Sequence, residues 1–239
     1  MKLLRLDKII ADNTNLSRKD VQKLAKNNLI MVNGEICNKV TEKFNPEEID
    51  IVIDGEHIVL NYKPSVLIFN KPEGYVCANH DDVNLTVFHL LPDGYNSFHC
   101  VGRLDLDTSG LLLLTNDGNF SHRLSSPKHH VAKKYYVTLA DPYEDSYLIQ
   151  MQEGILLRGE RDKTKPAILE FTDDPYRVYL TITEGRYHQV KRMFGALGNK
   201  VVELQRVAIG NLTLPEDLAE GEYLEVDVAE ALALINGSD

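Results

Sequence analysis

The sequence has few cysteines and no long apolar run. Its three cysteines, Cys37, Cys77 and Cys100, are far apart and form no Cys-x-x-Cys pair, which argues against a disulfide scaffold and a cysteine zinc site. No apolar run approaches the roughly 18 residues that a membrane helix needs. Residues 1–7 carry a charge at every second or third position and therefore lack the apolar stretch of a signal peptide. We expect a soluble cytoplasmic protein.

Motifs for cofactors are also missing. The sequence has no Gly-x-x-x-x-Gly-Lys-Ser/Thr loop and no Gly-x-Gly-x-x-Gly fingerprint, so nucleotide cofactors lack support. The histidines are not spaced with carboxylates as a metal site requires. We therefore expect a protein that uses neither a cofactor nor a metal ion.

Charge is distributed unevenly along the chain. The net charge is -10, yet residues 1–43 hold nine Lys and Arg against five acids, and residues 211–239 hold eight acids and no Lys or Arg. Binding to a phosphate backbone depends on the local field, because charges beyond a Debye length of about 8 Å are screened. The basic N-terminal segment therefore permits nucleic-acid binding, although an acidic C-terminal segment is also typical of a tail that aids solubility.

Two helices are predicted near the N-terminus. Apolar residues at helical spacing predict the first over residues 3–12. Ser17, with Asp20 three residues later, resembles a capping box that opens a second helix ending near Asn27. By spacing alone, a lysine stripe on this helix is typical of a solvated face. The stripe occupies positions i, i+4 and i+7 and consists of Lys19, Lys23 and Lys26.

A small sheet is predicted to follow. Asn33-Gly34 lies between two short alternating runs, which is a strong hairpin signal, and residues 49–53 predict a strand. Two helices and a small sheet predict a small domain over residues 1–60, followed by a linker over residues 61–64.

Residues 1–60 resemble an S4 domain, the small RNA-binding fold of ribosomal and RNA-modifying proteins. The resemblance rests on residues 5–8 (Arg-Leu-Asp-Lys), 16–18 (Leu-Ser-Arg) and 32–35 (Val-Asn-Gly-Glu). In that family the basic second helix and the hairpin contact structured RNA. The resemblance therefore implies RNA contacts for five basic residues, which are Arg5, Arg18, Lys19, Lys23 and Lys26.

Residues 65–239 are rich in predicted strands. The strands outnumber the helices and do not strictly alternate with them, which favours an α+β domain with a mainly antiparallel mixed sheet over a doubly wound sheet. Strands are predicted at residues 66–69, 111–114, 135–139, 167–171, 178–182 and 201–204, and helices at residues 119–125, 143–152 and 186–197.

The segment over residues 101–118 carries the most chemistry. Asp105 and Asp107 lie in a short polar loop directly before a run of four leucines. A carboxylate at the start of a buried strand is held rigidly, as a nucleophile or a base must be. An aspartate in such a turn also commonly caps main-chain amides. The residues alone leave both interpretations of Asp105 open, whereas Asp107 is expected to be a capping or solvated carboxylate.

Two other motifs compete for this loop. An EF-hand calcium loop would need a bidentate Glu where Asn116 stands. The two-aspartate signature of haloacid-dehalogenase-type phosphatases needs an apolar strand before its first aspartate. Here Gly102-Arg103 precedes Asp105, and the apolar strand follows. Both matches are poor.

Four ordered motifs resemble those of pseudouridine synthases, and in particular the RsuA group, which modifies ribosomal RNA. Residues 102–111, with Gly-Arg-Leu-Asp followed by Thr, Gly and Leu, resemble the active-site motif. Residues 70–74 resemble the Lys-Pro-x-Gly motif, residues 133–137 the Lys-x-Tyr motif, and residues 184–193 the third motif. The resemblance covers nearly the whole chain. It implies a catalytic domain over residues 65–239 that isomerises uridine to pseudouridine without a cofactor.

The resemblance also implies roles for single residues. Asp105 is the indispensable group, either as nucleophile at the ribose C1′ or as base on a ribose proton. Tyr135 matches the tyrosine that stacks on the flipped uracil, and Lys191 is the cation that holds Asp105 ionised. The resemblance also implies substrate-binding residues. Arg103 would occupy the space left by the flipped base, Lys71 and Lys133 would contact phosphates, and Arg192 would be the second cation. Leu111 would lie either in the core or at the uracil pocket.

The resemblance points to one substrate and leaves two alternatives open. The group's type member modifies uridine 516 of 16S rRNA, so the predicted function is a small-subunit rRNA pseudouridine synthase. Its predicted partner is ribosomal RNA in a partly assembled small subunit, and a monomer is the expected state. The alternatives are a 23S rRNA synthase of the same group and a non-catalytic rRNA-binding assembly factor.

Overall fold

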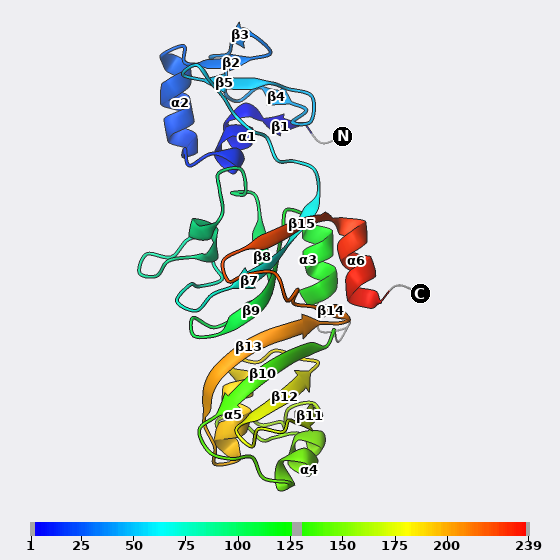
Figure 1. The fold of residues 1–239 in the computed structure, drawn as a ribbon. Helices are drawn as coiled ribbons and strands as arrows, with labels where there is room; N and C mark the ends of the chain where they lie inside the picture. The colour runs from blue at the N-terminus through cyan, green and yellow to red at the C-terminus, as the bar shows by residue number, and fades with distance from the viewer. Residues whose placement is uncertain (1–2, 126–130, 238–239) are drawn as a thin grey trace. The chain divides into compact units, whose positions relative to one another are not determined.

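The computed structural model describes residues 3–125 and 131–237 (Figure 1). The chain forms two compact units. One comprises the residues up to Pro64 together with Val87–His99, and the other comprises Ser65–Thr86 together with the residues from Cys100 on. Among the described residues, no helix is long and apolar enough to cross a membrane.

The first unit differs from the predicted small domain by one inserted segment. Val87–His99, which contains a short 3-10 helix (Val87–Leu90), groups with the N-terminal residues. One contact that holds it there is the hydrogen bond from Asn15 Nδ2 to Asp93 Oδ1, 2.8 Å long. The sequence gives little indication that this segment groups with the N-terminal residues, because Asn15 and Asp93 are 78 residues apart.

The first two helices of the chain are α1 (Leu6–Asn13) and α2 (Arg18–Lys26). The prediction of a helix from residue 3 is wrong at its start, because β1 (Leu4–Arg5) pairs instead with β4 (Lys43–Phe44). The predicted capping box is confirmed: the Ser17 side chain accepts a hydrogen bond from the main-chain N–H of Asp20, and Asp20 accepts one from that of Ser17.

A four-stranded sheet completes this unit among the described residues. Asn33 and Gly34 both have left-handed backbone angles, with φ of 52° and 83°, as a two-residue hairpin turn of type I′ requires. The predicted hairpin is therefore confirmed. The buried core contains Leu6, Ile9 and Ile10 of α1. The strand order is β3 (Glu35–Ile36), β2 (Ile30–Val32), β5 (Ile51–Ile53) and β6 (Glu56–His57).

The second unit is built on a mixed sheet, which confirms the α+β class. Only β13 and β9 run parallel among the main-path strand pairs that the structure describes; the other pairs are antiparallel. The path runs β11 (Ile168–Phe171), β12 (Arg177–Ile182), β10 (Lys133–Leu139), β13 (Val201–Ile209), β9 (Ser109–Thr115), β7 (Ser65–Lys71) and β15 (Tyr223–Asp227), with β14 (Leu212–Thr213) on β13 and β8 (His99–Val101) on β9.

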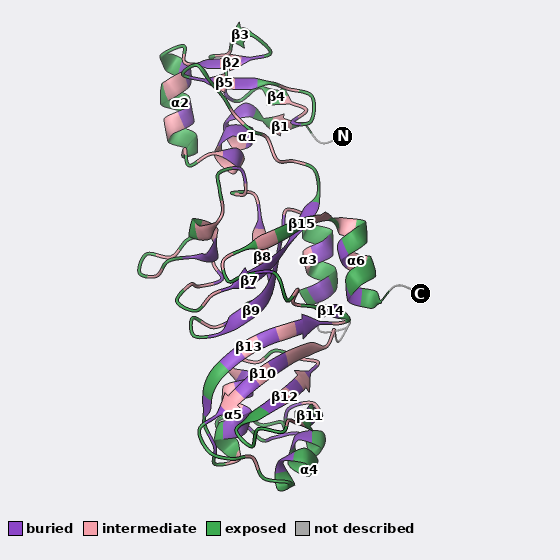
Figure 2. Ribbon diagram, in the orientation of Figure 1, coloured by how far each residue is buried: buried purple, intermediate pink, exposed green. Residues whose placement is uncertain are grey.

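Four helices among the described residues cover parts of this sheet (Figure 1). α3 (Gly118–Ser125) and α6 (Val228–Asn236) pack beside β7 and β9, and both central strands are buried along their whole length (Figure 2). α4 (Ser146–Glu153) contacts β11, and α5 (Gln189–Ala196) contacts β13. The rigid β7–β9 pair therefore forms the base from which the loop of Asp105 projects.

Candidate active site

A cleft of about 870 Å³ opens on the second unit. One wall is the loop before β9, with Arg103 and Asp105. A second is β10, with Lys133 and Tyr135, and a third is the segment that leads into α5. Four of the predicted site residues therefore line one cavity. The side chain of Asp105 is 30% exposed, so its carboxylate is open to the cleft while its loop is packed below.

Lys71 fixes the main chain of this loop. Its side chain is completely buried at the end of β7. Its ammonium group donates hydrogen bonds to the carbonyl oxygens of Asp105 (3.1 Å), Thr108 (2.7 Å) and Pro72 (3.0 Å). Burial lowers the pKa of Lys71, and nearby acidic groups partly oppose this effect. The prediction that Lys71 contacts a substrate phosphate is wrong, because its donors are turned inward to main-chain acceptors.

Two further contacts hold the loop. The main-chain N–H of Leu104 donates to Cys77 Sγ at 3.3 Å, and that of Thr108 donates to the carbonyl of Asp105 at 3.1 Å. The second bond closes a tight turn that begins at Asp105. The residue that carries the exposed carboxylate is thus anchored on both sides, which is the preorganisation that a reacting group needs.

His188 is the side chain that the structure places against the carboxylate of Asp105. Its Nε2 lies 3.4 Å from Asp105 Oδ1, and its ring stacks on that of Tyr187 with centroids 3.9 Å apart. His188 precedes α5 and has left-handed backbone angles (φ 47°, ψ 37°), which few non-glycine residues adopt. We did not predict His188 as a site residue. The only signal for it was its place inside the third motif.

Lys191 pairs with Asp107 rather than with Asp105. Its Nζ lies 2.5 Å from Asp107 Oδ1, and this hydrogen bond lowers the pKa of the Asp107 carboxyl. The expected partner of Lys191 is therefore wrong, and Asp107 is not merely a solvated carboxylate. The reason lies in the helix: His188 at its start faces Asp105, and Lys191 one turn later reaches the next carboxylate.

Alternation along β10 divides its side chains between two faces. Lys133 and Tyr135 line the cleft, and Tyr135 is 9% exposed. Burial, and then the nearby Arg206, lowers the pKa of Lys133. Tyr136 points to the opposite face, as expected, but it is half-buried against Tyr179, with ring centroids 5.0 Å apart, rather than in the core.

Arg206 of β13 is a site residue that sequence reasoning missed. It lines the cleft yet is only 4% exposed, and its Nε donates to the carbonyl of Leu111 at 2.7 Å. Within the described residues its Nη2 has no hydrogen-bond partner. The available signal was a single arginine in the otherwise strand-like run over residues 201–209. An unpaired buried donor beside the cleft can bind an acceptor that enters there.

Two predicted substrate-binding residues lie away from the cleft. Leu111 of β9 is fully buried in the core cluster that contains Phe120 and Leu124 of α3, so of the two placements left open by the sequence the structure has the one in the core. Arg192 pairs with Glu160 at 2.7 Å and donates to the carbonyls of Tyr187 and Arg158. Its guanidinium therefore binds a surface loop, and its role as a second cation at the substrate stays a prediction.

The basic residues of the first unit differ in availability. Arg18, Lys19, Lys23 and Lys26 are exposed on α2, so the predicted stripe exists. The guanidinium of Arg5 instead makes two hydrogen bonds to the buried carboxylate of Asp7, at 3.1 and 2.7 Å. Arg5 therefore stabilises the start of α1, and the prediction that it contacts RNA is not supported by its geometry.

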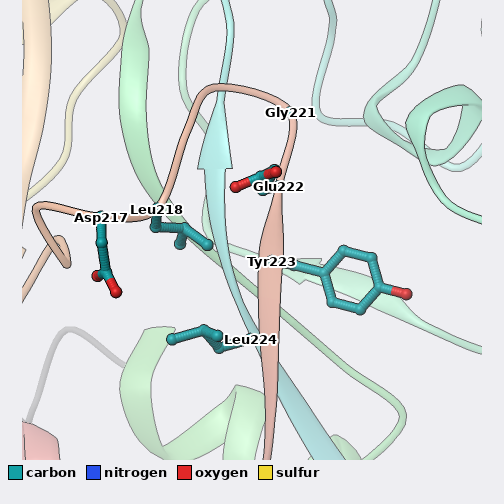
Figure 3. A pocket seen from close by; sticks show the side chains of 6 residues that line it. All are labelled: Asp217, Leu218, Gly221, Glu222, Tyr223 and Leu224. Carbon is teal, nitrogen blue, oxygen red and sulfur yellow. The ribbon is translucent and has the colours of Figure 1, made fainter.

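A second hollow, of about 430 Å³, lies at β15 and the loop before it (Figure 3). Its lining includes two carboxylates and no Lys or Arg, so it would repel a phosphate group. This hollow does not resemble a nucleic-acid site. The lining residues are Asp217, Leu218, Gly221, Glu222, Tyr223 and Leu224.

Comparisons with known proteins agree with this geometry. Residues 65–196 match the family described as RNA pseudouridylate synthase. The chain is 48% identical to a ribosomal small subunit pseudouridine synthase A of Pasteurella multocida, covering 98% of this chain and 100% of the relative. It is 45% identical to the protein of that name from Escherichia coli K12, covering 97% and 100%. A crystal structure of a pseudouridylate synthase, 47% identical, aligns with a TM-score of 0.69 over 97% of this chain and 99% of that one.

Proposed function

Because the chain belongs to the RNA pseudouridylate synthase family, we propose that it isomerises one uridine of small-subunit ribosomal RNA to pseudouridine. Relatives named for the small ribosomal subunit, at 45–48% identity over nearly the full chain, support this substrate class. The observation that carries the mechanism is the Asp105 carboxylate, anchored through its main chain and open to a cleft that also contains Tyr135 and His188.

The reaction rearranges bonds without net gain or loss of atoms. The N1–C1′ bond breaks, the uracil turns, a C5–C1′ bond forms, C5 loses its proton and N1 takes one up. Asp105 reaches the ribose only after the nucleotide flips out of its stack. It then acts as nucleophile at C1′ or as base on a ribose proton. His188, when protonated, stabilises the ionised carboxylate before attack.

The other cleft residues hold the flipped nucleotide. Tyr135 offers a ring on which the uracil stacks, a contact worth about 1–3 kcal/mol per base. Arg103 is exposed at the rim and fills the space that the base leaves. Lys133 and Arg206 bring positive charge to the cleft floor, where phosphate or carbonyl oxygens can accept hydrogen bonds. Lys191 acts through its pair with Asp107, which ties α5 to the catalytic loop.

The first unit serves as the RNA-binding part in this proposal. Its exposed α2 stripe and its resemblance to an S4 domain support contacts with structured rRNA. By the resemblance to the RsuA group, the proposed target is uridine 516 of 16S rRNA, in a partly assembled small subunit in the cytoplasm, and the protein acts as a monomer. A requirement for the folded subunit would explain why the chain carries a basic surface on a unit other than the catalytic one.

Two measurements test this function. We expect 16S rRNA from a strain that lacks the protein to lose one pseudouridine, mapped by sequencing; a missing pseudouridine in 23S rRNA instead would overturn the substrate. We also expect tritium release from C5-labelled uridine in rRNA to be abolished by Asp105→Asn while RNA binding changes little. Asp173→Asn, which removes an exposed carboxylate of the same unit outside the cleft, is the matched control. Full activity of Asp105→Asn would leave only an RNA-binding assembly factor.

A further inference from the structure

Arg206 is buried at the cleft with much of its hydrogen-bonding capacity unused. The side chain is 4% exposed, and its Nε donates to the carbonyl oxygen of Leu111 at 2.7 Å. Within the described ranges, its Nη2 has no partner and no carboxylate forms an ion pair with the guanidinium. Arginine keeps its charge inside proteins, so burying one without a counter-ion is costly. Such a cost is expected where the charge serves a ligand rather than the fold.

A bulge turns Arg206 toward the cleft. In the pairing of β10 with β13, Tyr135 lies opposite Arg206, and opposite residues of an antiparallel pair share one face of the sheet. The register then skips Val207, and this bulge lets Arg206 and Ile209 both line the cleft. Strict alternation from Ile209 would place Arg206 on the other face. The guanidinium therefore shares the cleft face with the tyrosine on which the uracil is proposed to stack.

The neighbouring strand fixes Arg206 from its other side. Gly110 of β9 pairs with Arg206 in the parallel ladder and has a φ of 99°. A Cβ at Gly110 would collide with the main-chain carbonyl oxygen of Arg206, so only glycine permits this close approach. Arg206 is thereby held between the strand that carries Tyr135 and the strand that continues from the loop of Asp105.

The charge around Arg206 is positive. Lys133 also lines the cleft, and burial, followed by the charge of Arg206, lowers its pKa. The two cations therefore lie near each other. A bound group that becomes negative during the reaction would be stabilised here more than the same group in its neutral ground state, and such a difference is what accelerates a reaction.

We propose that Arg206 binds a carbonyl oxygen of the flipped uracil and stabilises the negative charge that this base gains as its bond to the ribose breaks. The inference rests on the proposed function and adds to it a group that holds the leaving base. It makes Arg206 a catalytic residue, because its guanidinium contacts the reacting base.

The electron balance of the reaction calls for such a group. When the N1–C1′ bond breaks, both of its electrons stay with the uracil, whether Asp105 attacks C1′ or removes a ribose proton. The uracil anion holds this charge on N1 and, by conjugation, on both carbonyl oxygens. The charge disappears when C5 bonds to C1′, and the later loss of the C5 proton and gain of one at N1 leave the base neutral. The charge is transient, so a fixed cation lowers the barrier more than it tightens binding.

The first test compares the full-length protein with Arg206→Gln and Arg206→Met, which both replace the cation by a neutral side chain. We expect kcat for pseudouridine formation in rRNA to fall about 100-fold, as when one donor to a developing oxyanion is removed, with little change in KM. The midpoint of urea unfolding should not fall in at least one of the two variants, because a neutral side chain in place of a buried, unpaired cation is often neutral or stabilising.

The second test changes the leaving group. In rRNA that carries 5-fluorouridine at the target position, the fluorine withdraws electrons and itself stabilises the departing anion. Loss of the target nucleoside is measured by chromatography of the digested RNA for both substrates, since the fluorine replaces the C5 hydrogen whose release is otherwise followed. We expect the deficit of Arg206→Gln relative to wild type to be several-fold smaller on 5-fluorouridine than on uridine. Misfolding or weaker RNA binding would not depend on the leaving group in this way.

Arg177→Gln is the matched control, because it makes the same change at an exposed arginine of the same unit outside the cleft. We expect it to leave the rates on both substrates unchanged. For Arg206→Gln, an unchanged kcat, an equal deficit on both substrates, or a raised KM with a smaller salt slope, which marks a phosphate contact, would each overturn the inference. A lowered urea midpoint in both Arg206 variants would overturn it as well. Wild-type protein inactive on rRNA would count against the proposed function instead.

Discussion

The ammonium group of Lys71 lies 3.1 Å from the main-chain carbonyl oxygen of Asp105. It also donates to Thr108 and Pro72, so one buried lysine satisfies three carbonyl groups beneath the reactive carboxylate. A cation that is buried without a carboxylate hydrogen-bonded to it is costly, and these three bonds offset that cost. The contact links the end of β7 to the catalytic loop.

Lys71→Met should therefore act on the loop rather than on RNA binding. Three carbonyls lose their donor, and we expect a destabilisation of about 1–3 kcal/mol in urea unfolding. In the tritium-release assay kcat should fall more than KM rises, because the carboxylate is misplaced while the RNA surface is intact. A variant of normal stability with weakened RNA binding would show that Lys71 contacts phosphate after all.

His188→Ala should reduce turnover without affecting the fold. The ring is 39% exposed and faces Asp105, so its removal leaves little unfilled space but takes away the side chain that lies 3.4 Å from the carboxylate. A hydrogen bond to a charged group contributes about 1.5–3 kcal/mol, and the longer 3.4 Å contact of His188 should contribute no more than the lower end of that range, which is about a tenfold loss of kcat. Tyr187→Leu, which removes only the stacking partner, is the control. Equal losses of kcat in both variants would show that turnover depends on the stacked rings rather than on the contact between His188 and Asp105.

The pH dependence of stability in Asp107→Asn tests the ion pair between Asp107 of the loop and Lys191 of α5. Lys191 lowers the pKa of Asp107 in the folded state below its usual value of 3.8. At pH values above the usual pKa the ion pair contributes its full stabilisation. This contribution is lost as the pH falls through the lowered pKa of Asp107 in the folded protein. The difference in melting temperature between wild type and variant should be constant from about pH 5 to 8 and vanish in stronger acid. It should be small, because Asp107 is 70% exposed. A difference that persists at low pH would point to a role other than this ion pair.

Much of the catalytic unit could be predicted because its signals are local. The run of leucines in β9 and the alternation around Tyr135 in β10 identify strands from neighbouring residues alone. The motif around Asp105 identifies the loop in the same way. The missed elements have weaker local signals: β15 and α6 lie in an acidic segment that we interpreted as a tail, although Ala231 and Ile235 of α6 are buried against the sheet.

The errors at the site concern side-chain direction, which sequence does not contain. Lys71 ends β7 and Lys133 begins β10, yet the first side chain is turned inward and the second lies at the cleft. Likewise the spacing within α5 places a cation near the loop but does not decide whether Lys191 or His188 reaches Asp105. Only the start of the helix at Gln189, after a left-handed residue, settles that assignment.

The α2 stripe makes a separate prediction about RNA binding. Lys23 is 76% exposed and lies on the same face as Lys19 and Lys26, so its loss should not disturb the core. If it contacts a phosphate, Lys23→Ala should weaken binding to rRNA and reduce the slope of log K against log salt by about 0.7–0.9, the value expected for a single phosphate.

The matched control is Lys163→Ala, which removes the same charge from an exposed side chain of the second unit. We expect Lys163→Ala to leave the salt slope nearly unchanged, and Lys23→Ala to raise KM with little change in kcat. An equally small loss of RNA affinity in both variants would mean that the total charge of the protein governs binding. In that case α2 would be an ordinary solvated helix, because a specific contact must appear in the slope of one variant and not of the other.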